Sequence, residues 1–538
     1  MLFNRVNRKR QLRLIAKIIK WAFISIVSIL LILSVVFQAP WKIIVLFAVF
    51  LAALTVLPKP ARKYFWMSLG AIIIALLIWV LLPDNNEGWR PYTFDDDLAA
   101  FEAKYKIPDK ENAAVIYKNI LDNLDNKEFN DLPHEVYNVV YKEPWKSKDY
   151  PQAAKFVKEN ENVIAQLFDA SKKEKCLLPI ITDMQDYDQR YILTASIRRW
   201  AHWLVISANN DIAEGRINNA LEKLNAVHTM GAHENQQPNT VDMLVGISLK
   251  ALSMRGFKRI VIDQDVDDET LTRIEKMLVK DKLNWKTVLP KMIDSDKISH
   301  INKLSRYYEI NQKSKIRLSR DPWAQFRESL RERFEDSNEP ESELNKYYRN
   351  LLYPSYWKSK YLKAWTIWYW FYLPSNPEKA ADDAEAAFEK YYLKVKDDYD
   401  WDKEPNFIKS ITGMSKQGYH QVYYLYTRLK TDKKGVLLSI GLKRYKNITG
   451  EWPGSLDGIK ELTSEENFVD PMNNDSFVYK LTEDRFTLYS KGKNGIDEDG
   501  EYSSDWPEPA KPDDWLIWPP KTSNCNPQED DPKANQKQ

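Results

Sequence analysis

Three apolar runs occupy most of the first 83 residues, and no Asp or Glu occurs in that segment. The runs are residues 18–37, 41–57 and 64–82. About 20 apolar residues are enough to cross the hydrocarbon core of a bilayer. The segment 1–83 is therefore predicted to be a membrane anchor with three transmembrane helices.

The positive charges of this segment predict its orientation. Seven Lys and Arg side chains lie at or before Lys20, ahead of the uncharged part of the first run, and three lie between the second and third runs. Lys42 alone lies between the uncharged parts of the first and second runs, and only Arg90 closely follows the third. Because positively charged loops remain in the cytoplasm, the N-terminus is expected to be cytoplasmic. Three spans then place the rest of the chain outside. The expected protein is an integral, multi-pass membrane protein in contact with the lipid bilayer, with its C-terminal domain on the periplasmic side of the inner membrane.

The charge and cysteine content exclude several classes of protein. The chain has 78 Lys and Arg against 76 Asp and Glu, a net charge of +2, and eleven of the basic residues lie in the first 83 residues. The remainder is acidic overall, so a nucleic-acid-binding protein is not expected. Two cysteines, Cys176 and Cys525, are too few for a disulfide scaffold or a thiolate zinc site. The sequence leaves open whether they are bonded to each other.

Helical periodicity dominates the central region. Residues 84–110 have the acidic, proline-containing composition of a linker. Apolar residues then recur at spacings of three and four, which predicts an α-helical domain over 111–435. One stretch resembles a single tetratricopeptide hairpin through Ala208, Gly215, Ala220 and Leu224. No second copy follows at a period near 34 residues, so an αα-hairpin is expected, with a helical-repeat array as the alternative.

One segment of this region is unusually aromatic. Twelve of the 26 residues from Tyr347 to Tyr372 are Trp, Tyr or Phe, and three lysines are interleaved with them. Such a segment can fill a helical core, contact a membrane or a protein partner, or bind single-stranded nucleic acid. The expected location outside the cytoplasm disfavours the last interpretation. We therefore expect a protein partner and no nucleic-acid partner.

Recognisable catalytic motifs are absent from the sequence. It contains no G-x-S-x-G, H-E-x-x-H, G-x-x-x-x-G-K or C-x-x-C pattern. His228 and His233, beside Glu234, are interpreted as solvated loop residues, because Gly231 is expected to break the helix between them. His202 is interpreted as a packed helix residue. Carboxylates are abundant, so the sequence singles out no acid–base pair, and we assign no catalytic or cofactor-binding residue.

The last part of the chain contains a series of short motifs in a specific order. A helix-like run at 437–445 is followed by Gly450-Glu451-Trp452-Pro453 and Asp470-Pro471, two strand-like runs at 477–481 and 485–490, a glycine-containing loop at 492–500, and a final run at 513–518. This order resembles the head of the major pseudopilin of type II secretion systems. The resemblance implies a small α+β head at 436–518, although that family's cleaved N-terminal helix is missing here.

The resemblance also implies a calcium site in the loop after the second strand-like run. Asn494, Asp497, Asp499 and Asp513 supply the oxygen ligands that calcium prefers, and nearby glycines permit tight turns. The alternative is a solvated acidic turn. The proline-rich tail at 519–538 is expected to be disordered.

These observations predict a mainly α-helical protein with three N-terminal transmembrane helices, a large helical extracytoplasmic region and a small pseudopilin-like α+β head. The chain as a whole resembles large multi-span envelope proteins of bacteria. The expected function is that of a membrane-anchored, non-enzymatic binding or scaffold protein of the cell envelope. The alternatives are an envelope hydrolase with unlocated carboxylates and a component of a secretion or pilus-like assembly. A pair of buried acids in a cleft would favour the hydrolase, and a broad apolar groove would favour binding.

Overall fold

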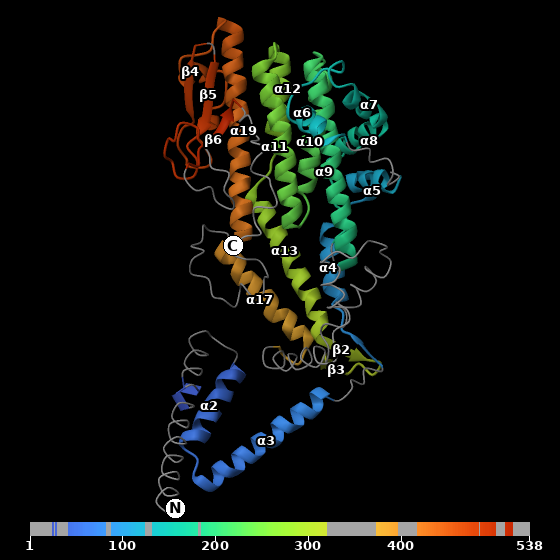
Figure 1. Cartoon of the computed structure of the whole chain (residues 1–538), viewed down its shortest axis with the longest axis vertical. Helices are drawn as coiled ribbons and strands as arrows, with labels where there is room; N and C mark the ends of the chain where they lie inside the picture. Colours follow the sequence, from blue (N-terminus) through green and yellow to red (C-terminus); the bar gives the residue numbers. More distant parts are fainter. Residues whose placement is uncertain are drawn as a thin grey trace, which may run out of the picture. The chain divides into compact units, whose positions relative to one another are not determined.

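The computed structural model describes the chain in ten stretches (Figure 1). They are residues 24–25, 27–28, 41–81, 88–123, 132–180, 184–319, 373–395, 417–483, 485–501 and 512–519. The aromatic segment Tyr347–Tyr372, Cys525 and the tail at 519–538, apart from its first residue, lie outside them. The described residues are mainly helical, with two small sheets.

The prediction of membrane spans is wrong. α2 (Trp41–Thr55) has 15 residues, about 22 Å at 1.5 Å per residue, whereas the hydrocarbon core is about 30 Å thick. α3 (Lys59–Leu81) is longer, but three of its first five residues are basic. Across the described stretches, no helix combines the length and the apolar character needed to cross a bilayer. This finding overturns the three transmembrane helices and the integral, multi-pass placement across the inner membrane; most of the run 18–37 lies outside the described residues.

The chain divides into two compact units, which we describe separately. Unit 1 comprises residues 1–99 and 297–412, and unit 2 comprises residues 100–296 and 413–538. The helical region predicted at 111–435 therefore contributes to both units, and the C-terminal head belongs to the same unit as most of that region.

Unit 1 contains a three-stranded antiparallel sheet, ordered β1-β2-β3. Its strands are β1 (Trp89–Pro91), β2 (Tyr308–Asn311) and β3 (Ile316–Leu318). Tyr308 packs with Phe94 and with alanines of α17 (Pro377–Val395) in a small core. The segment predicted as a linker is thus partly structured: it supplies β1 and α4 (Asp95–Tyr105), whose first turn carries three aspartates that favour a helix N-terminus.

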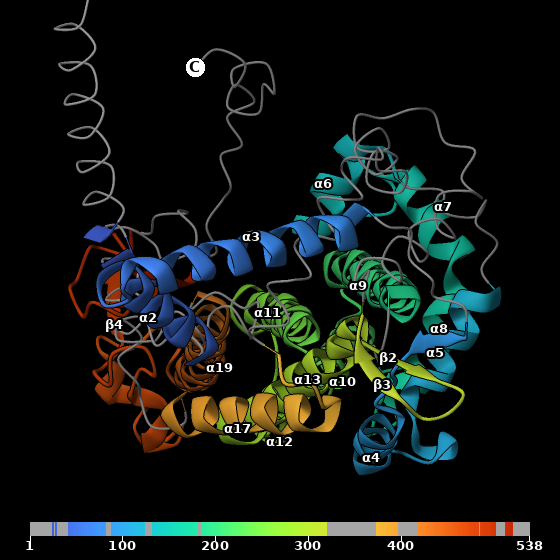
Figure 2. The same ribbon diagram turned by 90° about the horizontal axis from the view of Figure 1, so that it is seen from below.

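Unit 2 is built mostly from helices. They are α5 (Ala113–Asn123), α6 (His134–Lys142), α7 (Pro151–Glu159), α8 (Glu161–Ser171), α9 (Met184–Ala213), α10 (Ile217–Glu234), α11 (Thr240–Asp263), α12 (Asp268–Lys280) and α19 (Gln417–Thr449); α13 (Trp285–Leu304) begins in unit 2. α10 packs against α9 and α11, and α11 packs against α19. Figure 2 shows α9, α11 and α19 nearly end-on.

A helical hairpin lies at the position that sequence analysis indicated. α9 ends at Ala213 and α10 begins at Ile217. Gly215 between them has φ of +75°, a conformation that glycine adopts without strain. Ala208, Ala220 and Leu224 are all fully buried. The small residues on the two helices allow them to approach closely.

Gly231 does not break α10, contrary to the sequence-based interpretation. α10 continues through it to Glu234, and His228 and His233 are buried. A Cβ atom at Gly231 would lie 2.8 Å from the carbonyl oxygen of Gly246 in α11. Glycine is needed here because α10 and α11 cross with their backbones almost in contact. The two histidines are therefore interior residues and not solvated loop residues.

The C-terminal head is an α+β structure formed around α19. β4 (Val478–Thr482), β5 (Arg485–Ser490) and β6 (Trp515–Trp518) form an antiparallel sheet ordered β4-β5-β6. Phe486, Leu488 and Ile517 pack against Leu438 and Leu442 of α19. Two short 3-10 helices, η4 (Leu456–Ile459) and η5 (Glu465–Phe468), connect α19 to the sheet.

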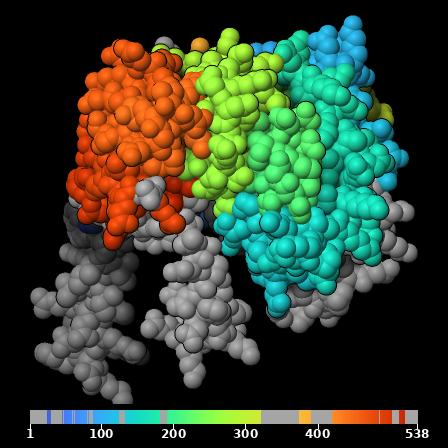
Figure 3. Space-filling model, turned by 90° about the horizontal axis from the view of Figure 1, so that it is seen from above, coloured from blue at the N-terminus to red at the C-terminus, as the bar shows by residue number. Residues whose placement is uncertain are grey.

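The head shares its long helix with the rest of unit 2. The predicted boundary at 435/436 falls inside α19, which is continuous from Gln417 to Thr449. In Figure 3 the orange residues of α19 lie against the yellow-green residues of α11 and α12. Arg444 of α19 bonds to Asp268 at 2.7 Å and to Glu275 at 2.9 Å, both on α12. Head and helices are therefore one packed body.

Candidate functional site

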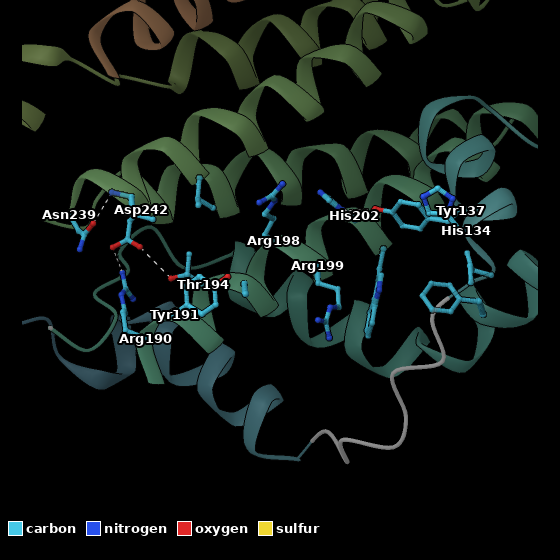
Figure 4. Close-up of a pocket in the computed structure, with 16 residues that line it drawn as sticks. His134, Tyr137, Arg190, Tyr191, Thr194, Arg198, Arg199, His202, Asn239 and Asp242 are labelled. Atoms are coloured by element: carbon cyan, nitrogen blue, oxygen red, sulfur yellow. Dashed lines mark hydrogen bonds and ion pairs between the residues drawn. The ribbon is translucent and has the colours of Figure 1, made fainter. Parts of the chain in front are cut away.

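A pocket of about 650 Å³ runs along α9 in unit 2 (Figure 4). Its walls come from α9, from α6 and the residues just before it, from α7, and from the start of α11. The volume lies in the range of small-molecule binding sites. All of its lining residues belong to one compact unit.

The polar side chains of the pocket lie on one face of α9. Arg190, Thr194, Arg198 and His202 follow one another at intervals of four residues. Residues four apart lie above one another on a helix. Leu193, Ile197, Trp200 and Leu204, on the opposite side, fill the core. The face of α9 that carries the polar side chains thus lines a pocket.

Arg190 and Asp242 form a buried ion pair at one end of this pocket. Nη2 of Arg190 donates to Oδ2 of Asp242 across 2.5 Å, and Thr194 donates to Oδ1 across 3.3 Å. The two charged side chains are only 5% and 4% exposed. Among the described residues, Nη1 of Arg190 has no hydrogen-bond acceptor. A buried donor without an acceptor costs about 1–3 kcal/mol, so an acceptor that reached this atom would remove that cost.

Asp242 is held in place by the start of α11. Asn239 caps this helix, accepting from the backbone N–H of Val241 at 2.7 Å. Asp242 follows in the first turn, where the helix dipole favours a negative charge. In Figure 4 Asn239 and Asp242 lie at the same end of the pocket as Arg190. The capping geometry fixes the carboxylate that holds Arg190.

Glu234 contributes no charge to this end of the site. Both of its carboxyl oxygens are buried and lack hydrogen-bond partners among the described residues. Burial raises the pKa of Glu234 well above its ordinary value; Asp242 raises it further, and Arg190 opposes them. Burial therefore favours the protonated, uncharged form of Glu234. Arg190 and Asp242 neutralise each other, so Arg198 remains as a positively charged side chain that lines the pocket.

His202 occupies the other half of the polar face. Its Nδ1 lies 2.7 Å from the hydroxyl of Tyr137 on α6, as Figure 4 shows. Burial, together with the charges of Arg198 and Arg255, lowers the pKa of His202 to about 4. The imidazole is consequently neutral at pH 7 and acts as an uncharged hydrogen-bonding group. It is a half-buried helix residue, as sequence analysis interpreted it.

Apolar and aromatic side chains complete the walls. Phe156 and Trp203 meet edge to face, with ring centroids 5.5 Å apart and an angle of 89° between the planes. Leu132 and Val245 add aliphatic surface. Trp203 lies 13 residues beyond Arg190 on α9, about 20 Å at 1.5 Å per residue. The pocket is therefore elongated, with an Arg190 end and an aromatic end.

This pocket has the composition of a binding site. Of the described residues that line it, Asp242 alone carries a carboxylate, and that carboxylate is paired with Arg190. Asp242 and Glu234 are a pair of buried acids, but only Asp242 reaches the pocket. The arrangement can hold an anion near the arginines and an apolar group beside Trp203.

The residues predicted to bind calcium lie in the loop between β5 and β6 of the head. Asp513 accepts through Oδ2 from the backbone N–H groups of Lys493 and Asn494, at 3.0 and 3.3 Å. Asp497 accepts from the hydroxyl of Tyr489 at 2.6 Å, and Asp499 pairs with Lys480. Within the described stretches, no three His, Cys, Asp or Glu side chains converge as metal ligands. Calcium binding stays a prediction.

The residues of the α9 pocket, apart from His202, were not singled out from the sequence. The apolar periodicity of α9 was used there, and the other polar residues between the apolar positions were not. The available signal was the four-residue repeat of Arg190, Thr194, Arg198 and His202. The repeat indicates a polar face on a helix, but it does not reveal the partner carboxylate of Asp242, which lies 52 residues from Arg190.

Searches with the chain matched no protein-family model, no curated protein and no solved structure. The resemblance of the head to pseudopilins therefore stays a hypothesis, and the functional argument rests on the geometry of the pocket.

Proposed function

We propose that unit 2 is a non-enzymatic binding module whose α9 pocket takes a small amphipathic anion, a molecule with an anionic head group on an apolar body. The observation that carries this proposal is Nη1 of Arg190, a buried cationic donor at the pocket that has no acceptor among the described residues.

The positive charge of the pocket favours a ligand with an anionic head group. Arg198 and Arg199 are exposed on the face of α9 that lines it. The carboxylate of Asp242 is fully used by Arg190 and Thr194, and burial favours the uncharged form of Glu234. A carboxylate or phosphate near Arg198 and Nη1 of Arg190 gains charge-assisted hydrogen bonds.

The side chains in the walls of the pocket favour a ligand with an apolar body. Leu132, Phe156, Trp203 and Val245 line it together with the methylene groups of long side chains. Removing apolar surface from water contributes about 25 cal/mol per Å². The elongated shape fits a chain or a ring system better than a compact inorganic ion.

The proposal is tested by calorimetric titration of the full chain with octanoate, octyl phosphate, octanol and octylammonium. These four ligands share one apolar body and differ in head group. The two anions are expected to bind at least about tenfold more tightly than octanol, with octylammonium the weakest, and their relative affinities identify the preferred anion.

Two variants complete this test. Arg198→Gln removes a lining charge and is expected to weaken anion binding while leaving octanol binding unchanged. Arg485→Gln removes an exposed arginine of the head, outside the pocket, and serves as the matched control. Equal binding of octanoate and octanol, or equal losses in the two variants, would overturn the proposal.

A further inference from the structure

A second pocket of unit 2, of about 860 Å³, has lysine at seven of its 21 lining positions. It lies among the ends of α8, α10 and α12 and the start of α13, and none of its lining residues belongs to the α9 pocket. Seven lysines line it, against the two carboxylates of Glu174 and Asp281. The lysines are Lys172, Lys173, Lys250, Lys276, Lys280, Lys282 and Lys291.

The helix termini around this pocket do not cancel its positive charge. The C-termini of α8, α10 and α12 each carry roughly half a negative charge, and the N-terminus of α13 carries roughly half a positive charge. Lysines near C-termini often serve only to neutralise such dipoles. Here the lysines and carboxylates that line the pocket leave a net charge of +5. Lys172 also pairs with Asp169 outside the lining, which lowers this charge to +4, and the termini reduce it to about +3. A net positive charge therefore remains after the carboxylates and the helix ends are counted.

The floor of the pocket is built from buried, mutually paired groups. Lys250 is 1% exposed, and its Nζ lies 2.9 Å from Oδ1 of Asp281. His228 lies 3.3 Å from Oδ2 of the same carboxylate through Nε2, and its Nδ1 lies 3.0 Å from the hydroxyl of Ser253. Lys433 donates to the backbone oxygen of Asp281 at 2.9 Å. This network fixes the loop between α12 and α13.

The carboxylate of Asp281 is already paired with Lys250 and His228 in the floor. It therefore does not neutralise the other lysines that line the pocket. Burial works to raise its pKa, but the nearby imidazole of His228 and the charge of Lys250 outweigh burial and lower it. Ser253, beside His228, is fully buried and donates its own hydroxyl proton to the carbonyl of Lys250. The Ser253–His228–Asp281 chain is thus enclosed. Lys172 and Lys280 pair with Asp169 and Glu174, and the lining lysines that remain available to a ligand are Lys276, Lys282 and Lys291.

From this arrangement we infer a second binding site, for a small molecule that carries several phosphate groups, in the lysine-lined pocket between α12 and α13. Lysines act as flexible point charges for phosphate. The start of α13 adds backbone N–H groups and a favourable dipole, with Thr287 in its first turn and Asn284 just before it lining the pocket. The volume fits one small molecule, which distinguishes this site from an extended surface for a macromolecule.

Inorganic pyrophosphate is the probe, titrated into the full chain by calorimetry at about 0.05 M and about 0.15 M salt. Binding is expected at the lower salt concentration and is expected to weaken at the higher one. The variant Lys276→Gln/Lys291→Gln removes two lining charges and should weaken binding at least about tenfold. Lys118→Gln/Lys155→Gln removes two exposed lysines outside the pocket and should leave the affinity within about twofold.

Equal losses in the two double variants, or no binding of pyrophosphate at the lower salt concentration, would overturn this inference. A thermal unfolding curve for each variant shows that it is folded. Octanoate binding to Lys276→Gln/Lys291→Gln should equal that of the unmodified chain, so failure at this site is distinguishable from failure at the α9 pocket.

Discussion

Arg190 of α9 and Asp242 of α11 are joined by a 2.5 Å ion pair in which both side chains are almost completely buried. The pair links two helices that cross at the end of the α9 pocket. Glu234 lies close enough for its pKa to respond to both charges. One guanidinium and two carboxyls thus share a small buried space, in which burial favours the protonated form of Glu234.

The first prediction separates the two acids. Asp242→Asn should destabilise the chain by about 3–5 kcal/mol, because it leaves the charge of Arg190 buried and unpaired. Glu234→Gln should cost less than about 1 kcal/mol, because a neutral carboxyl without a hydrogen-bond partner is replaced by an amide of the same shape. Urea unfolding at neutral pH measures both free energies. A larger loss in Glu234→Gln would show that Glu234 is ionised.

The second prediction concerns pH and the buried imidazole of His233. Burial lowers the pKa of His233 to about 4 in the native state, even though its Nε2 lies 2.8 Å from the carbonyl oxygen of Lys173. In the unfolded chain the histidine pKa is about 6.5. Between these values only the unfolded chain takes up the proton, so stability is complete above about pH 6.5 and falls as the pH is lowered towards 4. The loss from this one group approaches about 3 kcal/mol.

The measurement is the free energy of urea unfolding at several pH values between 7.5 and 4. His233→Gln should flatten the dependence of stability on pH over this interval, whatever its effect on stability at pH 7.5. His134, exposed on α6, provides the control, and His134→Gln should leave the slope unchanged. An unaltered slope in His233→Gln would contradict the assignment of a buried neutral imidazole.

The third prediction tests the close crossing of α10 and α11. A Cβ atom at Gly246 would lie 2.6 Å from the backbone oxygen of Gly231 and 2.2 Å from the side-chain nitrogen of Asn235. Gly246→Ala should therefore destabilise the chain by about 1–3 kcal/mol or more, since a backbone atom cannot move aside cheaply. Gly454→Ala is the control, because a Cβ atom there has no neighbour within 4 Å. Similar midpoints in chemical unfolding for the two variants would mean that the helices do not cross this closely.

The fourth prediction tests whether the C-terminal head binds calcium. Binding to the native state alone must raise the unfolding temperature, so calcium at about millimolar concentration should raise it relative to chelator, as for weak calcium modules. Asp497→Ala should abolish the shift, because Asp497 supplies a ligand oxygen. Identical unfolding curves with calcium and with chelator would remove the hypothesis and leave Asp497 and Asp499 as partners of Tyr489 and Lys480.

Local sequence patterns were sufficient to find several local elements of this protein. The order of short motifs that resembles a pseudopilin head placed the strands at Val478–Thr482 and Arg485–Ser490, and the glycine at 215 in the hairpin-like stretch marked the turn between α9 and α10. Apolar periodicity located the core face of α9. These features depend on residues a few positions apart, so pattern is sufficient to find them.

The tertiary structure decided the roles of residues that meet across long distances in sequence. Gly231 suggested a helix break until its contact with Gly246 showed a close helix crossing. The structure pairs Arg190 with Asp242, and it places Asp281 against His228 and Lys250. The apolar N-terminal runs predicted membrane spans that the described helices do not provide. The physical reason is common to the buried groups: burial and pairing set their charge, and both are properties of the packed chain that no local spacing encodes.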